Sequence, residues 1–120
     1  MKILVTVSES SELDNEFKID GTRIDERYLT KELNEWDEYA VEEAVQISEE
    51  DDDVEVVTVT IGPESADETI REALAKGGDR AIRLWDDALE EASVLDPATK
   101  ATLLAEIVRE EDPDLVLTGV

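Results

Sequence analysis

The side chains that could do chemistry in this sequence are mostly carboxylates. Asp and Glu number 34 against 11 Lys and Arg, and the chain contains neither cysteine nor histidine. Without a thiolate or an imidazole, it lacks the usual nucleophile, general base and zinc ligands of hydrolytic enzymes. The phosphate-binding fingerprints G-x-G-x-x-G and Walker A are also absent. We therefore expect no catalytic residue and no metal site, and the remaining question is what the chain binds.

The formal net charge of -23 limits the partners and sets the conditions of folding. A nucleic-acid duplex or an anionic membrane would be repelled at long range, so we expect neither as a partner. Self-repulsion opposes compaction, and concentrated salt, which shortens the screening length to about 3 Å at 1 M, relieves it. The charge therefore predicts a halophilic protein. A disordered acidic tail is the alternative, but such tails lack sustained helix and strand periods.

No stretch of the sequence approaches the apolar length of a signal peptide or a membrane helix. We therefore expect a soluble, cytoplasmic protein without membrane insertion. The acidic run at residues 49–53 is interpreted as a solvated loop. At 120 residues the chain is expected to form a single domain over residues 1–120.

Four apolar runs rich in β-branched residues predict strands at residues 3–7, 54–61, 81–85 and 115–118. The second run is nearly continuous in apolar character, which is typical of a parallel strand covered on both faces. Three segments with a helical period separate the strands. The first begins at Asn34, a typical N-cap, the second lies between Gly62 and Gly77, and the third between Asp96 and Asp112. The apolar stripe of the first helix is expected to contain Trp36, Ala40, Val41, Ala44 and Val45.

Residues 17–24 alternate around Asp20-Gly21 and predict a β-hairpin. The whole order predicts a doubly wound α/β fold with three crossover helices and a mainly parallel sheet. In such sheets a ligand lies beyond the carboxyl ends of the strands, where the strand order reverses. For the order 3-2-1-4 that point is near Thr6, Val7 and Gly119. Because the chain stops just after Gly119, we expect an incomplete Rossmann-like nucleotide-binding lobe.

Four strings along the chain resemble the electron-transfer flavoprotein beta subunits: NEWDEYAVEEAV at 34–45, VTVTIGP at 57–63, ETIREALAKGGDRAI at 68–82 and PDLVLTG at 113–119. The family has an N-P-F/Y-x-x-x-A-V-E-E-A-like string at the start of the first helix. It also has a V-x-V-x-x-G-P turn and an E-T-I/L-R-x-A-L-A-x-G-A-D-R/K-A string. The resemblance covers essentially the whole chain in the same order. It implies the N-terminal half, approximately, of such a subunit.

The resemblance implies an electron carrier rather than a catalyst on its own. Such a subunit forms a heterodimer with an alpha subunit, which holds most of the FAD, and carries electrons from dehydrogenases to an acceptor. The beta subunit itself binds AMP or, in electron-bifurcating members, a second FAD. Matched by position, the nucleotide contacts are expected at Thr6, Asn34, Glu35, Trp36, Asp37, Ile61 and Gly119.

The sequence departs from the family pattern at three points. Ser8 and Glu9 stand where the family usually has lysine after the first strand, so a positive charge near the phosphate is expected to be lost. Glu35 replaces the proline of the family string. Family members are also about twice as long as this chain, which implies a fragment or a split gene.

Each of these residues also has a purely structural interpretation. Asn34 can be a plain helix cap, Trp36 and Trp85 can pack in the core, Gly62 can form a strand-to-helix turn, and Thr6 can bond locally. The alternative function is a universal-stress-type adenine-nucleotide-binding module, whose Gly-x-x-Gly phosphate loop would lie beyond the last residue. A third possibility is an inert truncated product with exposed apolar surface and self-association.

Overall fold

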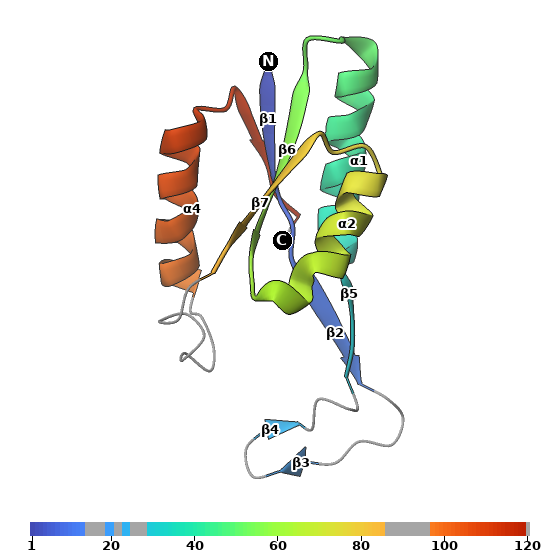
Figure 1. The fold of residues 1–120 in the computed structure, drawn as a ribbon, viewed down its shortest axis with the longest axis vertical. Coiled ribbons are helices and arrows are strands. Elements are labelled where there is room, and N and C mark those ends of the chain that lie inside the picture. Colours follow the sequence, from blue (N-terminus) through green and yellow to red (C-terminus); the bar gives the residue numbers. More distant parts are fainter. Residues whose placement is uncertain (14–18, 21–22, 25–28, 86–96, 120) are drawn as a thin grey trace.

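The structure, a computed structural model, describes residues 1–13, 19–20, 23–24, 29–85 and 97–119. Four strands form one parallel sheet: β1 (Lys2–Thr6), β6 (Glu55–Ile61), β7 (Arg80–Leu84) and β8 (Leu115–Leu117). Their order across the sheet is β7-β6-β1-β8 (Figure 1), which confirms the predicted order 3-2-1-4. β1 and β6 occupy the middle of the sheet, where both faces are covered, and this explains their continuous apolar runs.

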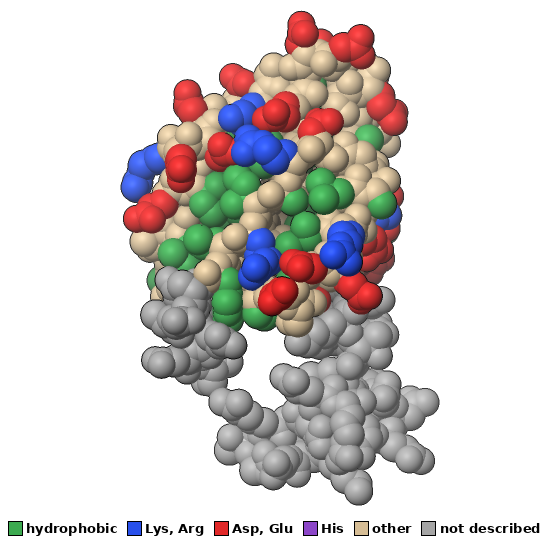
Figure 2. All heavy atoms as spheres, in the orientation of Figure 1, with side chains coloured by type: hydrophobic (Ala, Val, Ile, Leu, Met, Phe, Trp, Pro, Cys, Tyr) green, Lys and Arg blue, Asp and Glu red, His purple; other side chains and the backbone are tan. Residues whose placement is uncertain are grey.

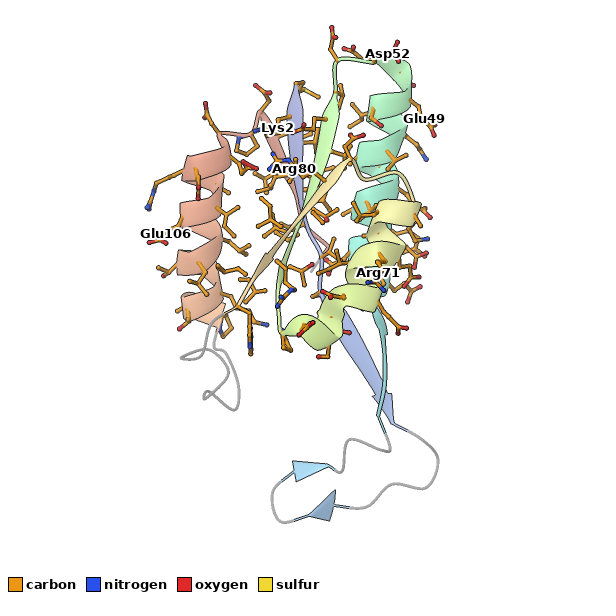
Figure 3. The ribbon with its side chains drawn as sticks, in the orientation of Figure 1. Lys2, Glu49, Asp52, Arg71, Arg80 and Glu106 are labelled. Carbon is orange, nitrogen blue, oxygen red and sulfur yellow. The ribbon has the colours of Figure 1, made fainter. Side chains whose placement is uncertain are left out.

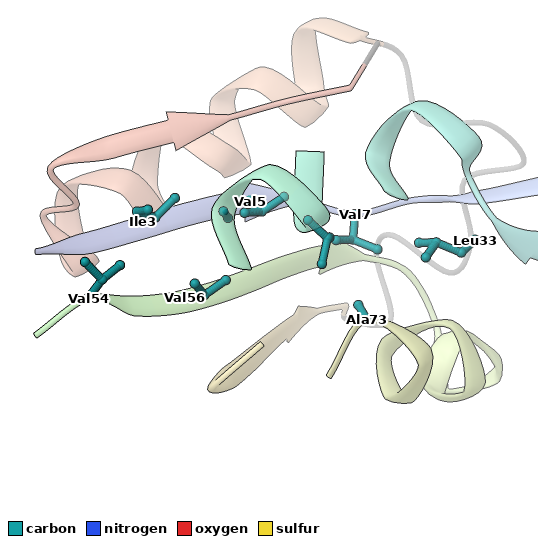
Figure 4. Close-up of a cluster of buried hydrophobic side chains, with 9 residues drawn as sticks. Ile3, Val5, Val7, Leu33, Val54, Val56 and Ala73 are labelled. Carbon is teal, nitrogen blue, oxygen red and sulfur yellow. The ribbon is translucent and has the colours of Figure 1, made fainter. Parts of the chain in front are cut away.

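Within the described residues, three helices pack on this sheet: α1 (Glu35–Glu50), α2 (Asp67–Ala75), which a 3-10 turn at Glu64–Ala66 precedes, and α4 (Pro97–Glu111). Successive side chains of a strand point to opposite faces. One buried cluster therefore joins alternate residues of the sheet to α1 and α2, and includes Ile3, Val5, Val56, Val41, Ala44 and Ala73 (Figure 4). A second cluster joins Leu4, Val57 and Val59 to Ile107 of α4. The helices thus cover both faces of the sheet, and the predicted α/β fold is confirmed (Figure 1).

The helix ends follow the expected signals. The Asn34 side chain caps α1, since its Oδ1 accepts hydrogen bonds from the backbone N–H groups of Trp36 (2.9 Å) and Asp37 (3.2 Å). Gly77, just after α2, has φ of 129°, a conformation that glycine adopts without strain. A Cβ at Gly77 would also lie 2.8 Å from Cγ1 of Val45 on α1. The capping role expected for Asp96 falls outside the described residues.

An antiparallel arm interrupts the path from β1 to α1. Strands β2 (Glu9–Leu13) and β5 (Leu29–Leu33) pair along their length, and β3 (Ile19–Asp20) pairs with β4 (Arg23–Ile24). The predicted hairpin is confirmed at β3 and β4, while residues 17, 18, 21 and 22 lie outside the described part. The sequence does not predict β2 and β5, because their polar residues show no apolar run. The arm is attached by a hydrogen bond from the Asn34 N–H to the Ser8 carbonyl at 2.9 Å.

The predicted stripe of α1 is wrong at its first residue. Trp36 is 58% exposed, whereas the residues of α1 that are buried are Asp37, Val41 and Ala44. These three are spaced i, i+4 and i+7, so the buried face begins one position later than expected. The polar Asp37 therefore faces inward in the first turn, and the Trp36 ring lies outside against Tyr39 at 6.0 Å between centroids. Trp85 is half-buried, which is consistent with packing.

Acidic side chains lie around the margin of the visible face, and hydrophobic side chains occupy its middle (Figure 2). Several Lys and Arg side chains form ion pairs with acidic side chains. Lys76 contacts Glu38 at 2.7 Å between α2 and α1, and this hydrogen bond is the main cause of the raised pKa of Lys76. No helix in the described part of the chain is long and apolar enough to cross a membrane.

Candidate functional site

A cavity of about 160 Å³ lies at the carboxyl ends of β1 and β6. The strands contribute the residues at which they end, and α1 and α4 close the sides. Its lining consists of Thr6, Val7 and Ser8 from the end of β1, Val59 and Ile61 from β6, Asp37 from α1, and Lys100 and Leu104 from α4. The cavity therefore includes Thr6 and Val7, near which the sequence predicts a ligand site. It extends toward β6 rather than toward β8.

The gap between the ends of β1 and β8 is filled by the side chain of Asp37, which is 4% exposed. Its Oδ2 accepts hydrogen bonds from the Ser8 N–H (2.8 Å) and from the Ser8 hydroxyl (2.6 Å). Its Oδ1 accepts a hydrogen bond from the Gly119 N–H at 3.2 Å. A buried carboxylate is costly unless it is hydrogen-bonded, and these three donors meet that need. Asp37 thus ties together the residue after β1, the first turn of α1 and the backbone after β8.

Gly119 approaches the first turn of α1 so closely that a side chain has no room. A Cβ built at this position would lie 2.5 Å from the backbone N of Asp37 and 2.5 Å from the carbonyl carbon of Trp36, and would also meet Oδ1 of Asp37. Real Cβ atoms essentially never come so near to backbone atoms. The missing side chain therefore allows the Gly119 N–H to reach the Asp37 carboxylate.

Comparison with known proteins agrees with this architecture. Residues 22–120 match the family model described as the electron transfer flavoprotein domain. The chain is 46% identical over 123 residues to the electron transfer flavoprotein subunit beta of Methylophilus methylotrophus, a match that covers 100% of this chain and 46% of that protein. The chain belongs to the electron transfer flavoprotein beta-subunit family. The resemblance seen in the sequence strings is thereby confirmed.

Other members of the family are similar along the same span. The electron transfer flavoprotein subunit beta of Dictyostelium discoideum is 33% identical over 99% of this chain and 46% of its own length. The caffeyl-CoA reductase-Etf complex subunit CarD of Acetobacterium woodii is 42% identical over 99% of this chain and 45% of its own length. The chain thus spans about half the length of the curated relatives it matches.

The structure brings together four of the seven residues expected to contact a nucleotide in this family. Thr6, Asp37 and Ile61 line the cavity, and Gly119 adjoins it through Asp37. The other three do not line it. Asn34 caps α1, while the side chains of Glu35 and Trp36 are exposed. Contact of any of the seven with a ligand stays a prediction.

The cavity also contains residues that sequence reasoning missed. Lys100 and Leu104 come from the first half of α4, and Ser8 anchors Asp37 rather than only marking a departure from the family string. A signal for the α4 residues was present, because a helix that leads from β7 back to β8 must end at the amino edge of the sheet. Its first turns, after Pro97, must therefore start at the carboxyl edge, where the ligand is expected.

The lining of the cavity combines aliphatic and polar side chains. Val7, Val59, Ile61 and Leu104 supply aliphatic surface, while hydroxyls and one ammonium group supply polar contacts. Among the described residues, no group of three or more acidic side chains is arranged to hold a metal ion. The volume is below the roughly 300–1,000 Å³ of a typical ligand pocket.

Proposed function

We propose that this chain forms part of the nucleotide-binding lobe of an electron transfer flavoprotein beta subunit. In this role it binds AMP, or a second FAD, and assists an alpha subunit in carrying electrons through FAD from dehydrogenases to an acceptor. The observation that carries the proposal is the cavity at the carboxyl ends of β1 and β6, where Thr6, Asp37 and Ile61 meet. The family match favours this function over the universal-stress-type alternative.

The residues present fit an adenine nucleotide. The aliphatic side chains of Val59, Ile61 and Leu104 offer surface to an adenine ring or a ribose, and the hydroxyl of Thr6 offers a directional hydrogen bond. Lys100 offers a positive charge. The redox chemistry belongs to the flavin when it is bound, and the protein contributes position and electrostatics. The chain is therefore proposed to be an electron-carrier subunit and not an enzyme on its own.

Nucleotide binding to the cavity tests this function. In molar KCl, AMP is titrated calorimetrically into the wild-type chain, into Ile61→Phe, and into Glu106→Gln as control. Ile61→Phe puts a ring into the cavity and is expected to abolish binding. Glu106 is exposed on α4 and points away from the sheet (Figure 3), so Glu106→Gln should bind as the wild type does.

A second titration with FAD distinguishes the two candidate ligands. Equal binding by Ile61→Phe and the wild type would show that the nucleotide binds outside the cavity. No binding of AMP or FAD by the wild-type chain, alone or mixed with an alpha subunit, would contradict the proposed function itself.

A further inference from the structure

Lys100 is a cation at the cavity that the expected nucleotide contacts do not include. It lies in the first turn of α4, one helical turn before Leu104, and both side chains line the cavity. Residues four apart share one face of a helix. Leu104 is partly buried and packs against the cluster of Leu4, Val57 and Val59. The aliphatic stem of the exposed Lys100 can therefore follow the apolar wall that Leu104 continues, with its ammonium group in solvent at the rim.

Asp37, the acidic side chain of the lining, does not neutralise the charge of Lys100. Asp37 accepts hydrogen bonds on both oxygens, from Ser8 and Gly119. Within the described residues, no acidic side chain forms an ion pair with Lys100. Four other cations do have acidic partners there, namely Lys2, Lys76, Arg80 and Arg83. Lys100 thus combines a place at the cavity with a positive charge that no described carboxylate neutralises.

An anionic ligand needs a nearby positive charge in this chain more than in most proteins. In dilute salt the net charge of -23 repels phosphate groups at long range, and in molar KCl, where the screening length is about 3 Å, a bound phosphate still needs a positive charge in direct contact. A neutral adenosine moiety does not experience this repulsion, but a phosphate group does. A single ammonium group at the rim offsets it locally, because charge-assisted hydrogen bonds to phosphate are short and strong.

We propose that Lys100 binds the phosphate group of the nucleotide held in this cavity, and that it gives the site its preference for a nucleoside monophosphate over the nucleoside. This inference rests on the proposed function. It adds a phosphate contact from α4, on the opposite side of the sheet from α1 and Asp37. The strands and α1 supply the shape of the pocket, and α4 supplies the charge.

The test compares two probes, AMP and adenosine, by calorimetric titration of the full chain in molar KCl. Lys100→Gln is expected to weaken AMP binding about tenfold, as the loss of one charge-assisted hydrogen bond does, and to leave adenosine binding unchanged. Lys100→Arg should restore most of the AMP affinity. The matched control is Arg109→Gln, which removes the same charge from an exposed position in the last turn of α4, away from the cavity. This control should bind AMP as the wild type does.

The results separate this inference from the function on which it rests. If Lys100→Gln weakens AMP and adenosine equally, Lys100 shapes the cavity and does not bind phosphate, which overturns the inference while the proposed function stands. Equal AMP loss in Lys100→Gln and Arg109→Gln would mean a general charge effect, and overturns it as well. If the wild-type chain, alone or mixed with an alpha subunit, binds neither probe, the proposed function and the inference fail together. Circular dichroism of each variant verifies that it is folded.

Discussion

The two ends of the parallel sheet hold their carboxylates in different ways. At the carboxyl ends of the strands, Asp37 accepts hydrogen bonds from two backbone N–H groups and one hydroxyl, all of them neutral. At the amino ends, Asp79 and Asp114 also accept backbone hydrogen bonds, at 2.8 Å each, but Glu111 receives charged partners: Arg80 at 2.6 Å and Lys2 at 3.8 Å. Figure 3 shows Lys2 and Arg80 at this same end of the sheet. Arg80 also bridges to Glu55 at 3.3 Å.

This difference has consequences for binding and for the response to salt. Hydrogen bonds from neutral donors stabilise Asp37 without using a cation, which leaves Lys100 available at the cavity. They are also partly buried, around a carboxylate that is 4% exposed, and salt screens such interactions less than fully exposed ones. The ion pairs at the amino ends join Glu111, whose side chain is 15% exposed, to Arg80 (45%) and Lys2 (30%), and they weaken as salt rises because the cations are partly exposed. Asp37 is therefore held by neutral donors alone, whereas the amino ends of the strands add the ion pairs of Glu111 to their backbone hydrogen bonds.

The largest effect is expected from removing the charge of Asp37. Asp37→Asn replaces one acceptor oxygen with an NH₂ donor, so either orientation of the amide leaves a backbone N–H of Ser8 or Gly119 without an acceptor. We expect the free energy of unfolding to fall by about 2–3 kcal/mol. Urea denaturation in molar KCl measures this change.

The matched control is Glu43→Gln, which removes the same charge from an exposed position of α1. It should change the stability little. Comparable losses in the two variants would mean that the Asp37 hydrogen bonds do not stabilise the carboxyl end of the sheet, and the contrast between the two ends would no longer hold.

A smaller effect is expected from adding a methyl group at Gly119. Gly119→Ala drives a Cβ against the backbone of Trp36 and Asp37, so the strand end must shift and the hydrogen bond to Asp37 must lengthen. We expect a loss of about 1–2 kcal/mol, measured by the same denaturation experiment. The control is Gly78→Ala, whose Cβ would have its nearest neighbours at 3.5 Å, an ordinary contact. A Gly119→Ala chain as stable as Gly78→Ala would show that this approach is not tight in solution.

Much of the fold could be predicted because its signals are local. The apolar runs of β1 and β6 are continuous since both faces of these strands are buried, and helices on both sides follow from the alternation of elements. Asn34 and Gly77 marked their helix ends because capping and positive φ depend on a residue's own chemistry. The strand order predicted the edge of the sheet and the end of β1 at which the cavity lies, but not its extension toward β6 instead of β8.

The rest depends on contacts between distant segments, which no local pattern shows. Asp37 faces inward because Ser8 and Gly119 offer donors there, 29 and 82 residues away along the chain. The apolar stripe predicted for α1 therefore wrongly included Trp36, which is exposed. Strands β2 and β5 form an arm with polar sequences, where cross-strand pairing replaces burial as the stabilising factor. The sequence analysis did not single out Lys100, because only the fold shows that α4 lies beside the ends of β1 and β6.

The smallest effect is expected at the amino end of the sheet. Arg80→Gln removes the ion pairs with Glu111 and Glu55, and should lower the unfolding temperature slightly at the lowest salt concentration at which the chain folds. The difference from the wild type should disappear in molar KCl, because partly exposed pairs are screened. The control is Arg71→Gln, since Arg71 is exposed on α2 and forms no ion pair with a described residue. An Arg80→Gln deficit that persists in molar salt would mean that Arg80 acts through packing or buried hydrogen bonds, and the two ends would then be stabilised alike.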